Sequence, residues 1–515
     1  MKTPSLLSLV LGTSLAFSPL AEASPEPEAA AAAAAAGGGK HHDHWPRKPL
    51  VSPKKLESKI RLRDLIHGEQ RLQDFANAYP ARNRVFGGEA HKDTVDWLYR
   101  ELKATKYYDV YKQEQVHLWS KSDLLFEVNG EEHDSLGMTY APSGDATADI
   151  FVVPNLGCET ADFDGVEGKI ALIERGECTF GDKSALAGAS KAAAAVIYNN
   201  LPGDLAGTLG EPTNPLGPYV ATLGITQEVG QEILAQAETE TVSAHVWVET
   251  LFENRTTWNV IAETKGGNKN NVITLGGHTD SVEAGPGIND DGSGIISNLV
   301  VAKALTGFSV KNAVRFCFWT AEEFGLLGSQ FYIDSLSEEE RAKIKLYLNF
   351  DMIASPNYAN MIYDGDGSAF NLSGPPGSAE IEKLFEKFYE DQKLPHTPGE
   401  FSGRSDYAAF IDAGIPSGGL FTGAEGLKTE EEARLFGGEA GVAYDVNYHA
   451  VGDDIDNLAH DAFLLNSKAT AYAVATYAIS TDSLPERTIA KRSVGREGKF
   501  NGYKGQCWCH RRCDW

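Results

Sequence analysis

The sequence predicts an α/β fold in which a mixed, largely parallel sheet is sandwiched by helices and carries a smaller inserted α/β domain. From Trp258 to about Ser480, strand-like apolar runs alternate with helical patterns, which is typical of a sheet covered by helices. Three β-rich runs, each followed by a polar cluster, support this architecture: residues 271–276, 313–319 and 345–350. In such folds ligands bind beyond the carboxyl ends of the strands, so these polar clusters form the candidate site.

Composition and charge exclude several classes of partner. The chain has 515 residues, of which 42% are hydrophobic, so its length suits two or three domains with a sizeable core. The formal net charge of -26 argues against nucleic acid, whose phosphates need a basic patch, and against docking on anionic lipid. We expect a monomer without nucleic-acid or membrane partners, whose charge serves solubility.

The N-terminus predicts export. Lys2 precedes a mostly apolar run over residues 6–20, and Ala21-Glu22-Ala23 fits the small-x-small rule before a cleavage site. The run is short for a membrane span and no later stretch is long enough. We therefore expect a signal peptide over residues 1–23 and a secreted, extracellular protein. Asn254 and Asn371 begin glycosylation sequons that suit this route.

Changes in composition and periodicity indicate the domain boundaries. Residues 24–53 form a low-complexity leader with an alanine tract and a histidine cluster. Apolar positions at helix spacing begin near Lys54, so we assign residues 54–129 to the first part of the main domain. The insert is expected over residues 130–248, the rest of the main domain over 249–485, and a tail over 486–515.

The insert itself shows short apolar runs between Gly-rich turns. Strands are predicted at residues 150–153, 170–173 and 194–198, and a helix over residues 185–195. The stretch from Gly168 through Phe180 resembles the protease-associated domain. That resemblance implies a Cys158–Cys178 disulfide and a domain that shapes access to a neighbouring site without catalytic residues of its own.

The other cysteines lie elsewhere. Cys317 falls within the apolar run 313–319 and is expected to be a buried free thiol. Cys507, Cys509 and Cys513 crowd the C-terminus, where a local disulfide or a processed tail explains them better than a zinc knuckle.

Polar clusters follow the three strand-like runs, and one more lies near the C-terminal end of the main domain. They comprise His278-Thr279-Asp280, Asn289-Asp290-Asp291, Glu322-Glu323, Asp351 and Tyr448-His449. A hydrolytic metal site needs neutral imidazole and carboxylate ligands, with positions left open for water and substrate. Two ions roughly 3.5–4 Å apart also need a carboxylate that reaches both. Two histidines and three carboxylates, one of them shared, meet that requirement.

Spacing within the clusters suggests roles. His278 and Asp280 lie two apart at a strand end, so their side chains leave on the same side, and Asp280 is placed to accept the second ring N–H of His278. Glu322 and Glu323 are adjacent and diverge, so one can ligate a metal while the other serves as general base. Each residue alone has an ordinary explanation in a turn or at a helix start. Their joint placement after successive strands is what points to a metal site.

These segments resemble the co-catalytic two-zinc aminopeptidase family, and closely resemble its secreted fungal leucine aminopeptidases. The resemblance extends from about Lys54 to Ser480, and its most specific parts are Gly-Pro-Gly-Ile-Asn-Asp at residues 285–290 and Ala-Glu-Glu-Phe-Gly at residues 321–325. It implies a zinc aminopeptidase fold with two zinc ions per chain. It also implies that the protein releases N-terminal residues, preferably Leu and other apolar ones, from peptides and proteins with a free N-terminus.

The resemblance assigns a role to each matching residue. The implied metal ligands are His278 and Asp351 for one ion, Glu323 and His449 for the other, and Asp290 bridging both. Asp291 would bridge if the motif were shifted by one residue. Glu322 would be the general base, and Tyr448 would donate a hydrogen bond to the oxyanion. The substrate would be contacted by Arg404 along its backbone and by Met352 and Phe421 around its first side chain. The chain departs from many relatives by reading Ser405-Asp406-Tyr407 where they have Ser-Asp-His, but that position is not a metal ligand in the family.

Three alternatives remain on the same scaffold. A carboxypeptidase would need a cationic pocket for the substrate carboxylate, and Arg404 is the only obvious basic residue within the motifs. A glutaminyl cyclase would work with one zinc ion, so metal stoichiometry separates it. A non-catalytic receptor would have lost ligands, whereas every expected ligand is present here.

Overall fold

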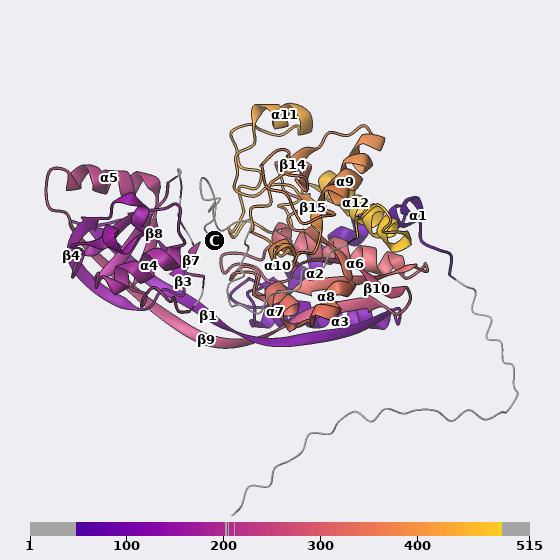
Figure 1. The fold of residues 1–515 in the computed structure, drawn as a ribbon, viewed down its shortest axis with the longest axis horizontal. Coiled ribbons are helices and arrows are strands. Elements are labelled where there is room, and N and C mark those ends of the chain that lie inside the picture. Colours follow the sequence, from indigo (N-terminus) through magenta and orange to yellow (C-terminus); the bar gives the residue numbers. More distant parts are fainter. Residues whose placement is uncertain (1–47, 201–202, 204, 206, 211, 487–515) are drawn as a thin grey trace, which may run out of the picture. The chain divides into compact units, whose positions relative to one another are not determined.

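The computed structural model describes residues 48–200, 203, 205, 207–210 and 212–486 (Figure 1). The predicted signal peptide, most of the leader, nearly all of the predicted tail and the three C-terminal cysteines lie outside this part of the chain. Within it, no helix combines the length and apolarity needed to cross a membrane.

The helices in chain order are α1 (Pro53–Glu57), α2 (Leu62–Asn77), α3 (Glu89–Ala104), α4 (Phe180–Ala189), α5 (Gln227–Ala237), α6 (Gly294–Leu305), α7 (Leu327–Ser335), α8 (Glu338–Lys343), α9 (Ser378–Asp391), α10 (Tyr407–Asp412), α11 (Glu430–Phe436) and α12 (His460–Ile479). Short 3-10 turns occupy η1 (Asn155–Gly157) and η2 (Thr160–Phe163), and a π turn occupies η3 (Ile288–Ser293).

The strands are β1 (Tyr108–Val128), β2 (Glu131–Glu132), β3 (Leu136–Thr139), β4 (Gly144–Val152), β5 (Ile170–Glu174), β6 (Ala194–Tyr198), β7 (Gly207–Thr208), β8 (Thr222–Ile225), β9 (Ser243–Thr264), β10 (Asn268–His278), β11 (Asn312–Trp319), β12 (Ile344–Phe350), β13 (Met361–Tyr363), β14 (Thr397–Gly399) and β15 (Ser417–Phe421). The three β-rich runs predicted in the main domain are therefore strands β10, β11 and β12.

The sheet of the main domain runs in the order β14-β13-β15-β12-β10-β11-β9. Strands β15, β12, β10 and β11 pair in parallel, whereas β9 joins β11 antiparallel and β13 joins β15 antiparallel. This mixed, largely parallel sheet confirms the predicted fold class. The chain leaves β10 for β11 on one side and returns to β12 on the other, so the sheet order reverses at β10, where α/β folds place their ligands.

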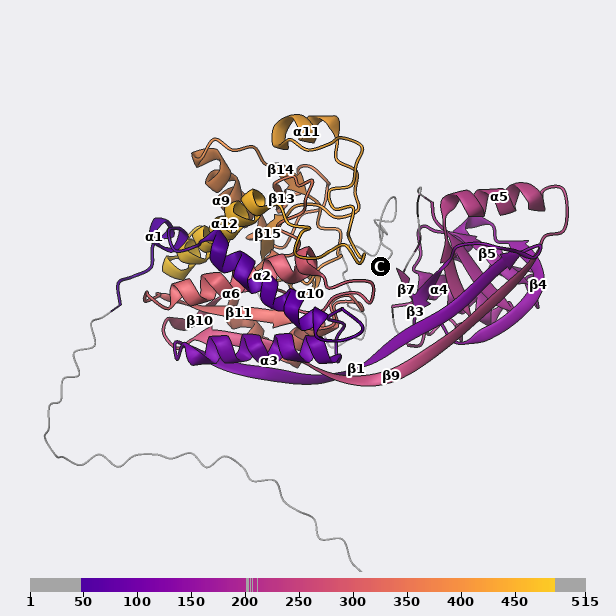
Figure 2. The same ribbon diagram turned by 180° about the vertical axis from the view of Figure 1, so that it is seen from behind.

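Side chains of β11 alternate between two cores, as successive residues of a strand must. Val314, Phe316 and Phe318 pack into the larger core, together with apolar residues of α2, α3, α6 and α12. Cys317 and Trp319 face the opposite core, which α7 and α10 complete. Figures 1 and 2 show these two faces: α7 and α8 lie in front of the sheet in Figure 1, and α2 and α3 lie in front of it in Figure 2. Cys317 is a buried free thiol, as predicted.

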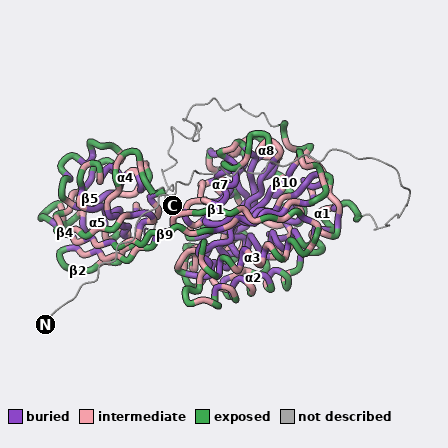
Figure 3. Tube along the Cα trace, turned by 90° about the horizontal axis from the view of Figure 1, so that it is seen from below, coloured by how far each residue is buried: buried purple, intermediate pink, exposed green. Residues whose placement is uncertain are grey.

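The insert has its own sheet and its own apolar cores. Strands β4, β5, β6 and β8 pair in parallel, and apolar side chains pack on both faces of this sheet. Figure 3 shows buried positions inside both domains, for example along β5 and β10, whereas β4 has none. The predicted Cys158–Cys178 disulfide is present and joins the residue after η1 to the segment before α4.

One prediction within the insert is wrong. The helix expected over residues 185–195 is α4, which begins at Phe180 and ends at Ala189. Ala194 and Ala195 begin the fully buried strand β6 between β5 and β8, and the strand predicted over residues 194–198 has the observed bounds. Alanine favours a helix locally, but pairing on both sides in a buried parallel sheet overrides that weak preference.

The insert and the main domain share the two longest strands. β1 and β9 pair antiparallel along their whole length, from Tyr108 opposite Thr264 to Val128 opposite Ala244. Because β9 begins at Ser243 and ends at Thr264, residue 248 lies within a continuous strand. The transition between the domains is therefore made by paired strands rather than by a loop.

Candidate metal centre

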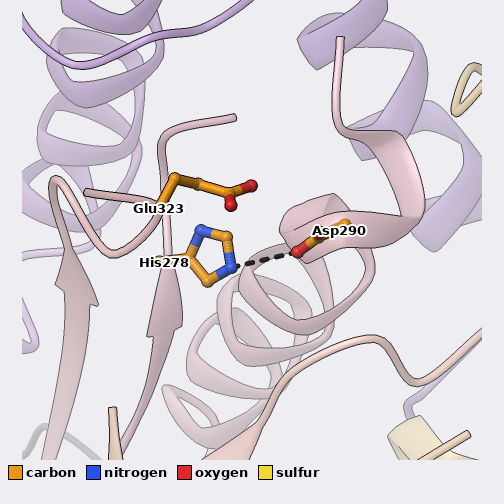
Figure 4. A group of neighbouring side chains, drawn as sticks. All are labelled: His278, Asp290 and Glu323. Carbon is orange, nitrogen blue, oxygen red and sulfur yellow. Dashed lines mark hydrogen bonds and ion pairs between the residues drawn. The ribbon is translucent and has the colours of Figure 1, made fainter. Parts of the chain in front are cut away.

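Five predicted ligands come together from distant parts of the main domain. His278 ends β10, Asp290 lies in η3, and Glu323 follows β11. Asp351 follows β12, and His449 lies in the loop between α11 and α12. The carboxyl ends of parallel strands meet at one edge of the sheet, which brings these side chains into a single cluster. Figure 4 shows His278 with its ring directed at Asp290 and with Glu323 beside it.

Asp290 lies between the two imidazole rings. Its Oδ1 is 3.1 Å from Nε2 of His278, and its Oδ2 is 3.2 Å from Nε2 of His449. Asp351 Oδ1 lies 3.7 Å from His278 Nε2, and Glu323 Oε2 lies 2.9 Å from His449 Nε2. The five residues thus form two sets, one around each histidine, with one oxygen of Asp290 facing each set.

Asp291, the alternative to Asp290, faces the backbone. Its carboxylate accepts N–H bonds from His278 at 3.0 Å, Gly294 at 2.9 Å and Met352 at 3.2 Å. These bonds tie the end of β10, the start of α6 and the segment after β12 to one side chain. The contacts therefore support Asp290 rather than Asp291 as the carboxylate shared by the two sets.

Asp280 lies beside His278 but is bonded differently from our expectation. The Nδ1 atom of His278 is 3.2 Å from the backbone carbonyl oxygen of Asp280 and 3.7 Å from its carboxylate. The carboxylate instead accepts the backbone N–H groups of Glu322 at 3.1 Å and Glu323 at 3.3 Å. Asp280 therefore connects the end of β10 to the turn that carries both glutamates.

Charge in the cluster is unbalanced, because carboxylates outnumber imidazoles. Burial disfavours the charged form of His278, but the Glu322 and Asp351 carboxylates outweigh it and raise the pKa of His278 well above its usual range. The neighbouring Glu323 and Asp290 carboxylates raise the pKa of His449 to about 10. Burial also raises the pKa of the Glu322 carboxyl well above its usual range. Such a cluster favours positive charge at its centre.

The residues present fit a metal ion. Two groups of residues could each hold an ion, because within each group the potential ligand atoms lie within 4.8 Å of one another. One group is His278, Asp290 and Glu323, and the other is His278, Asp291 and Asp351. Glu323 Oε1 is buried and accepts no hydrogen bond from the described part of the chain. Imidazole nitrogens and carboxylate oxygens are ligands that zinc accepts, so the donor set suits this ion.

Tyr448 and Arg404 contact each other at this centre. Arg404 Nη2 donates to the Tyr448 hydroxyl oxygen at 3.1 Å, and Arg404 Nη1 pairs with Glu425 Oε1 at 2.6 Å. The Tyr448 ring stacks on the His449 ring with the centroids 3.8 Å apart. Because Arg404 occupies a lone pair of the Tyr448 oxygen, the phenolic proton can be donated to another acceptor.

The residues predicted around the first side chain of a substrate lie at the ends of β12 and β15. Met352 is buried, and its backbone carbonyl accepts a hydrogen bond from the Thr422 N–H. Phe421 ends β15 and lies parallel to Tyr363, with ring centroids 6.5 Å apart. A separate small pocket lies over Asp290 and Glu323, and its remaining lining residues are Val282, Gly287, His449, Ala450 and Asp453.

Several residues that hold the predicted ligands in place were not predicted from the sequence. Ser405 Oγ donates to Asp351 Oδ2, and the Asp453 carboxylate accepts the backbone N–H groups of Asn289 and Asp290. Buried Arg84 donates to backbone carbonyls of residues 279, 286 and 287. Each of these residues contacts a segment that is distant in the sequence, so the local sequence pattern did not indicate the contact.

Known proteins resemble this chain in sequence over most of its length. Fold and site together are those of a metallohydrolase. Residues 259–474 match the sequence pattern of peptidase family M28, and residues 146–233 match the PA domain. The chain is 64% identical over 453 residues to the probable leucine aminopeptidase 2 of Aspergillus fumigatus, covering 87% of this chain and 90% of that protein. It is 57% identical over 470 residues to leucine aminopeptidase 2 of Trichophyton rubrum, covering 90% and 94%. The chain therefore belongs to peptidase family M28.

Solved structures share the fold. The aminopeptidase from Aneurinibacillus sp. strain AM-1 is 27% identical, with a TM-score of 0.68 over 86% of this chain and 99% of that chain. BSAP, a zinc aminopeptidase from Bacillus subtilis, is 23% identical and has a TM-score of 0.59 over 85% and 97%. The family resemblance predicted from the sequence is thus confirmed.

Proposed function

We propose that this chain is a secreted zinc aminopeptidase that holds two zinc ions and releases N-terminal residues, preferably Leu and other apolar ones, from peptides and proteins. The observation that carries the proposal is the position of Asp290, with one carboxylate oxygen facing His278 and the other facing His449. Such a carboxylate suits two neighbouring ions. Aminopeptidase relatives across most of the chain and a zinc aminopeptidase of the same fold support the activity and the metal.

The proposed ligands divide into two sets that share Asp290. His278 and Asp351 would hold one ion, and Glu323 and His449 would hold the other. Zinc bound there would lower the pKa of a water molecule and polarise the scissile carbonyl. The site residues would supply the remaining steps of the reaction.

Glu322 is the proposed general base. Its Oε2 lies 3.8 Å from His278 Nε2, so Glu322 lies beside the proposed ligands. The two ligand sets are complete without it. Burial raises the pKa of its carboxyl, which favours accepting a proton from the attacking water. The same oxygen would then deliver that proton to the leaving amine nitrogen. The Tyr448 hydroxyl would donate its proton in a hydrogen bond to the oxyanion, as its contact with Arg404 allows.

The carboxypeptidase alternative is less consistent with the contacts of Arg404. A carboxypeptidase would need an unengaged cation for the substrate carboxylate, but Arg404 already pairs with Glu425 and bonds Tyr448. The cluster near Asp290 is instead rich in carboxylates, which suit a protonated N-terminal amine.

The exposed positions of Asn254 and Asn371 are compatible with glycosylation in an exported protein.

Hydrolysis of Leu-p-nitroanilide tests the proposal. A zinc chelator should abolish the activity, and added zinc should restore it. Plasma emission spectroscopy should find two zinc ions in each active chain, and a peptide library should be shortened only from the N-terminus. Activity that survives complete metal removal would refute the assignment, and one ion per chain would favour a single-zinc enzyme.

A further inference from the structure

The loop that carries Tyr448 and His449 is tied to the turn that carries Asp290. Asp453 makes three bonds to that turn: its backbone carbonyl accepts the Ile288 N–H at 3.1 Å, its Oδ1 accepts the Asn289 N–H at 2.7 Å, and its Oδ2 accepts the Asp290 N–H at 3.0 Å. Asp453 is only 2% exposed, so water cannot readily replace these bonds. The backbone of the Asp290 turn is therefore fixed by a residue 163 positions further along the chain.

Asp445 makes a second connection between the same two segments. The Asn289 side-chain amide donates to Asp445 Oδ2 at 2.7 Å and to Ser355 Oγ at 3.1 Å. The Asp445 carbonyl accepts the backbone N–H of Tyr448 at 3.3 Å. Asp445 thus contacts both the side chain beside Asp290 and the backbone beside His449.

Asn457 joins the two aspartates. Its Nδ2 lies 3.0 and 2.9 Å from the two Asp445 oxygens and 3.2 Å from Asp453 Oδ1. Its Oδ1 accepts the Asn447 side-chain amide at 2.7 Å. Asp445, Asp453 and Asn457 are all buried, and we call these three residues the clamp.

The two proposed ligand sets differ in how much they depend on the clamp. His278 and Asp351 follow directly from β10 and β12, and Asp291 fixes the adjoining backbone from inside the sheet. His449 belongs to no strand or helix, has a positive φ of 54°, and its side chain is 38% exposed. Its placement opposite Asp290 therefore depends on the bonds that hold its own loop.

We propose that the clamp consists of positioning residues that hold His449 and Asp290 in register, and that it selectively secures the ion between Asp290, Glu323 and His449. This inference rests on the proposed function, because it takes the two-ion site as given. Residues that orient metal ligands typically contribute about 10–100-fold to metal affinity. Loss of the clamp should consequently weaken one of two binding events and leave the other nearly unchanged.

Zinc titration of the metal-free full-length protein, with a competing chelator, tests the selectivity. Asp453→Asn replaces one accepting oxygen by an amide that cannot accept an N–H, while keeping the size of the side chain. We expect one of the two dissociation constants to rise about 10–100-fold and the other to change by less than about threefold. Asn457→Ser should weaken the same event, and it decides the question if Asp453→Asn does not fold.

Asp364→Asn is the matched control. Asp364 is also a buried aspartate that accepts three backbone N–H groups, from Ser368, Ala369 and Phe370, but it lies outside the clamp and the ligand sets. This control should lower the melting temperature without changing either zinc affinity.

Three results would overturn the clamp: unchanged affinities in a folded clamp variant, equal weakening of both events, or the same selective loss in the control. If the wild-type protein binds two ions and is active, such a result contradicts only the proposed role of the clamp. A wild-type protein that binds only one ion contradicts the two-ion proposal as well, and the two failures are therefore distinguishable.

Discussion

At the scale of single residues, the contacts of Tyr448 define what its hydroxyl can do. Arg404 donates to the Tyr448 oxygen, and Glu425 fixes the other end of the guanidinium. The pair therefore directs the phenolic proton away from Arg404 and leaves it for a substrate oxygen. In this account Arg404 acts through Tyr448, which refines the expectation that it lies near the substrate backbone.

Tyr448→Phe should lower kcat on Leu-p-nitroanilide by about 100-fold with little change in KM, because one donor to the developing oxyanion is lost. Arg404→Ala should lower kcat as well. The kcat of the double variant should be about equal to that of Tyr448→Phe, because both changes remove the hydrogen bond between Arg404 and Tyr448. Steady-state kinetics of the three variants form the test. Additive losses in kcat would contradict action through Tyr448.

Glu322→Gln separates proton transfer from metal binding. The amide cannot take up a proton, so kcat should fall by about 100- to 10,000-fold while zinc content stays at the wild-type value. Glu323→Gln is the matched control, because the same change at a proposed ligand should reduce zinc content. A Glu322→Gln enzyme with a nearly unchanged rate would place the general base elsewhere.

At the scale of elements, the strands of the insert are joined by an ionic contact as well as by backbone bonds. His245 on β9 lies between Glu127 on β1 and Asp145 on β4, at 3.1 and 2.9 Å. Hydrogen bonds to Asp145 and Glu127 raise the pKa of His245 above its ordinary value of about 6.5. The imidazolium is thus stabilised in the folded state relative to the unfolded chain.

This contact predicts a pH dependence with a defined sign. Because the folded pKa exceeds the unfolded one, the stabilisation is complete below the unfolded pKa and is lost as pH rises through the folded pKa. His245→Gln should therefore destabilise the insert by about 0.5 kcal/mol at pH 5 and have little effect at pH 9. Denaturant unfolding of both proteins at the two pH values measures this difference. An equal loss at both pH values would show that packing, rather than charge, explains the effect.

Elements were predictable where the local pattern and the tertiary environment agree. Strands β11 and β12 begin one residue before the predicted runs and end with them, whereas β10 begins three residues before and ends two residues after the predicted run 271–276. In the alanine-rich stretch, the strand predicted over residues 194–198 has the bounds of β6, whereas the predicted helix was extended past the end of α4 at Ala189 into that strand, which pairs with β5 and β8. Local preference is weak compared with burial in a sheet.

At the scale of the whole chain, the fold and the clustering of the proposed ligands could be predicted, but the contacts that hold these side chains in place could not. Three of the proposed ligands, His278, Glu323 and Asp351, lie at or just after strand ends, so the sequence pattern indicates them. The clamp and Arg84 contact the same turns from distant segments, and short-range pattern carries no information about such contacts. Asp280 illustrates the difference, because its position was predicted while the partners of its carboxylate, the backbone of Glu322 and Glu323, were not.

A second acidic group provides an internal comparison for the metal site. Asp364, Asp366 and Glu382 also lie close enough to hold an ion, but this group contains no imidazole. Asp364 and Glu382 already accept backbone N–H groups, which compensate their charge. Zinc should therefore discriminate between the two groups and choose the one with histidines.

Anomalous scattering at the zinc edge from crystals of the zinc-loaded protein tests the central claim most directly. We expect two peaks roughly 3.5–4 Å apart, with Asp290 between them, His278 and Asp351 at one, and Glu323 and His449 at the other. A single peak, or peaks only at Asp364, Asp366 and Glu382, would contradict it.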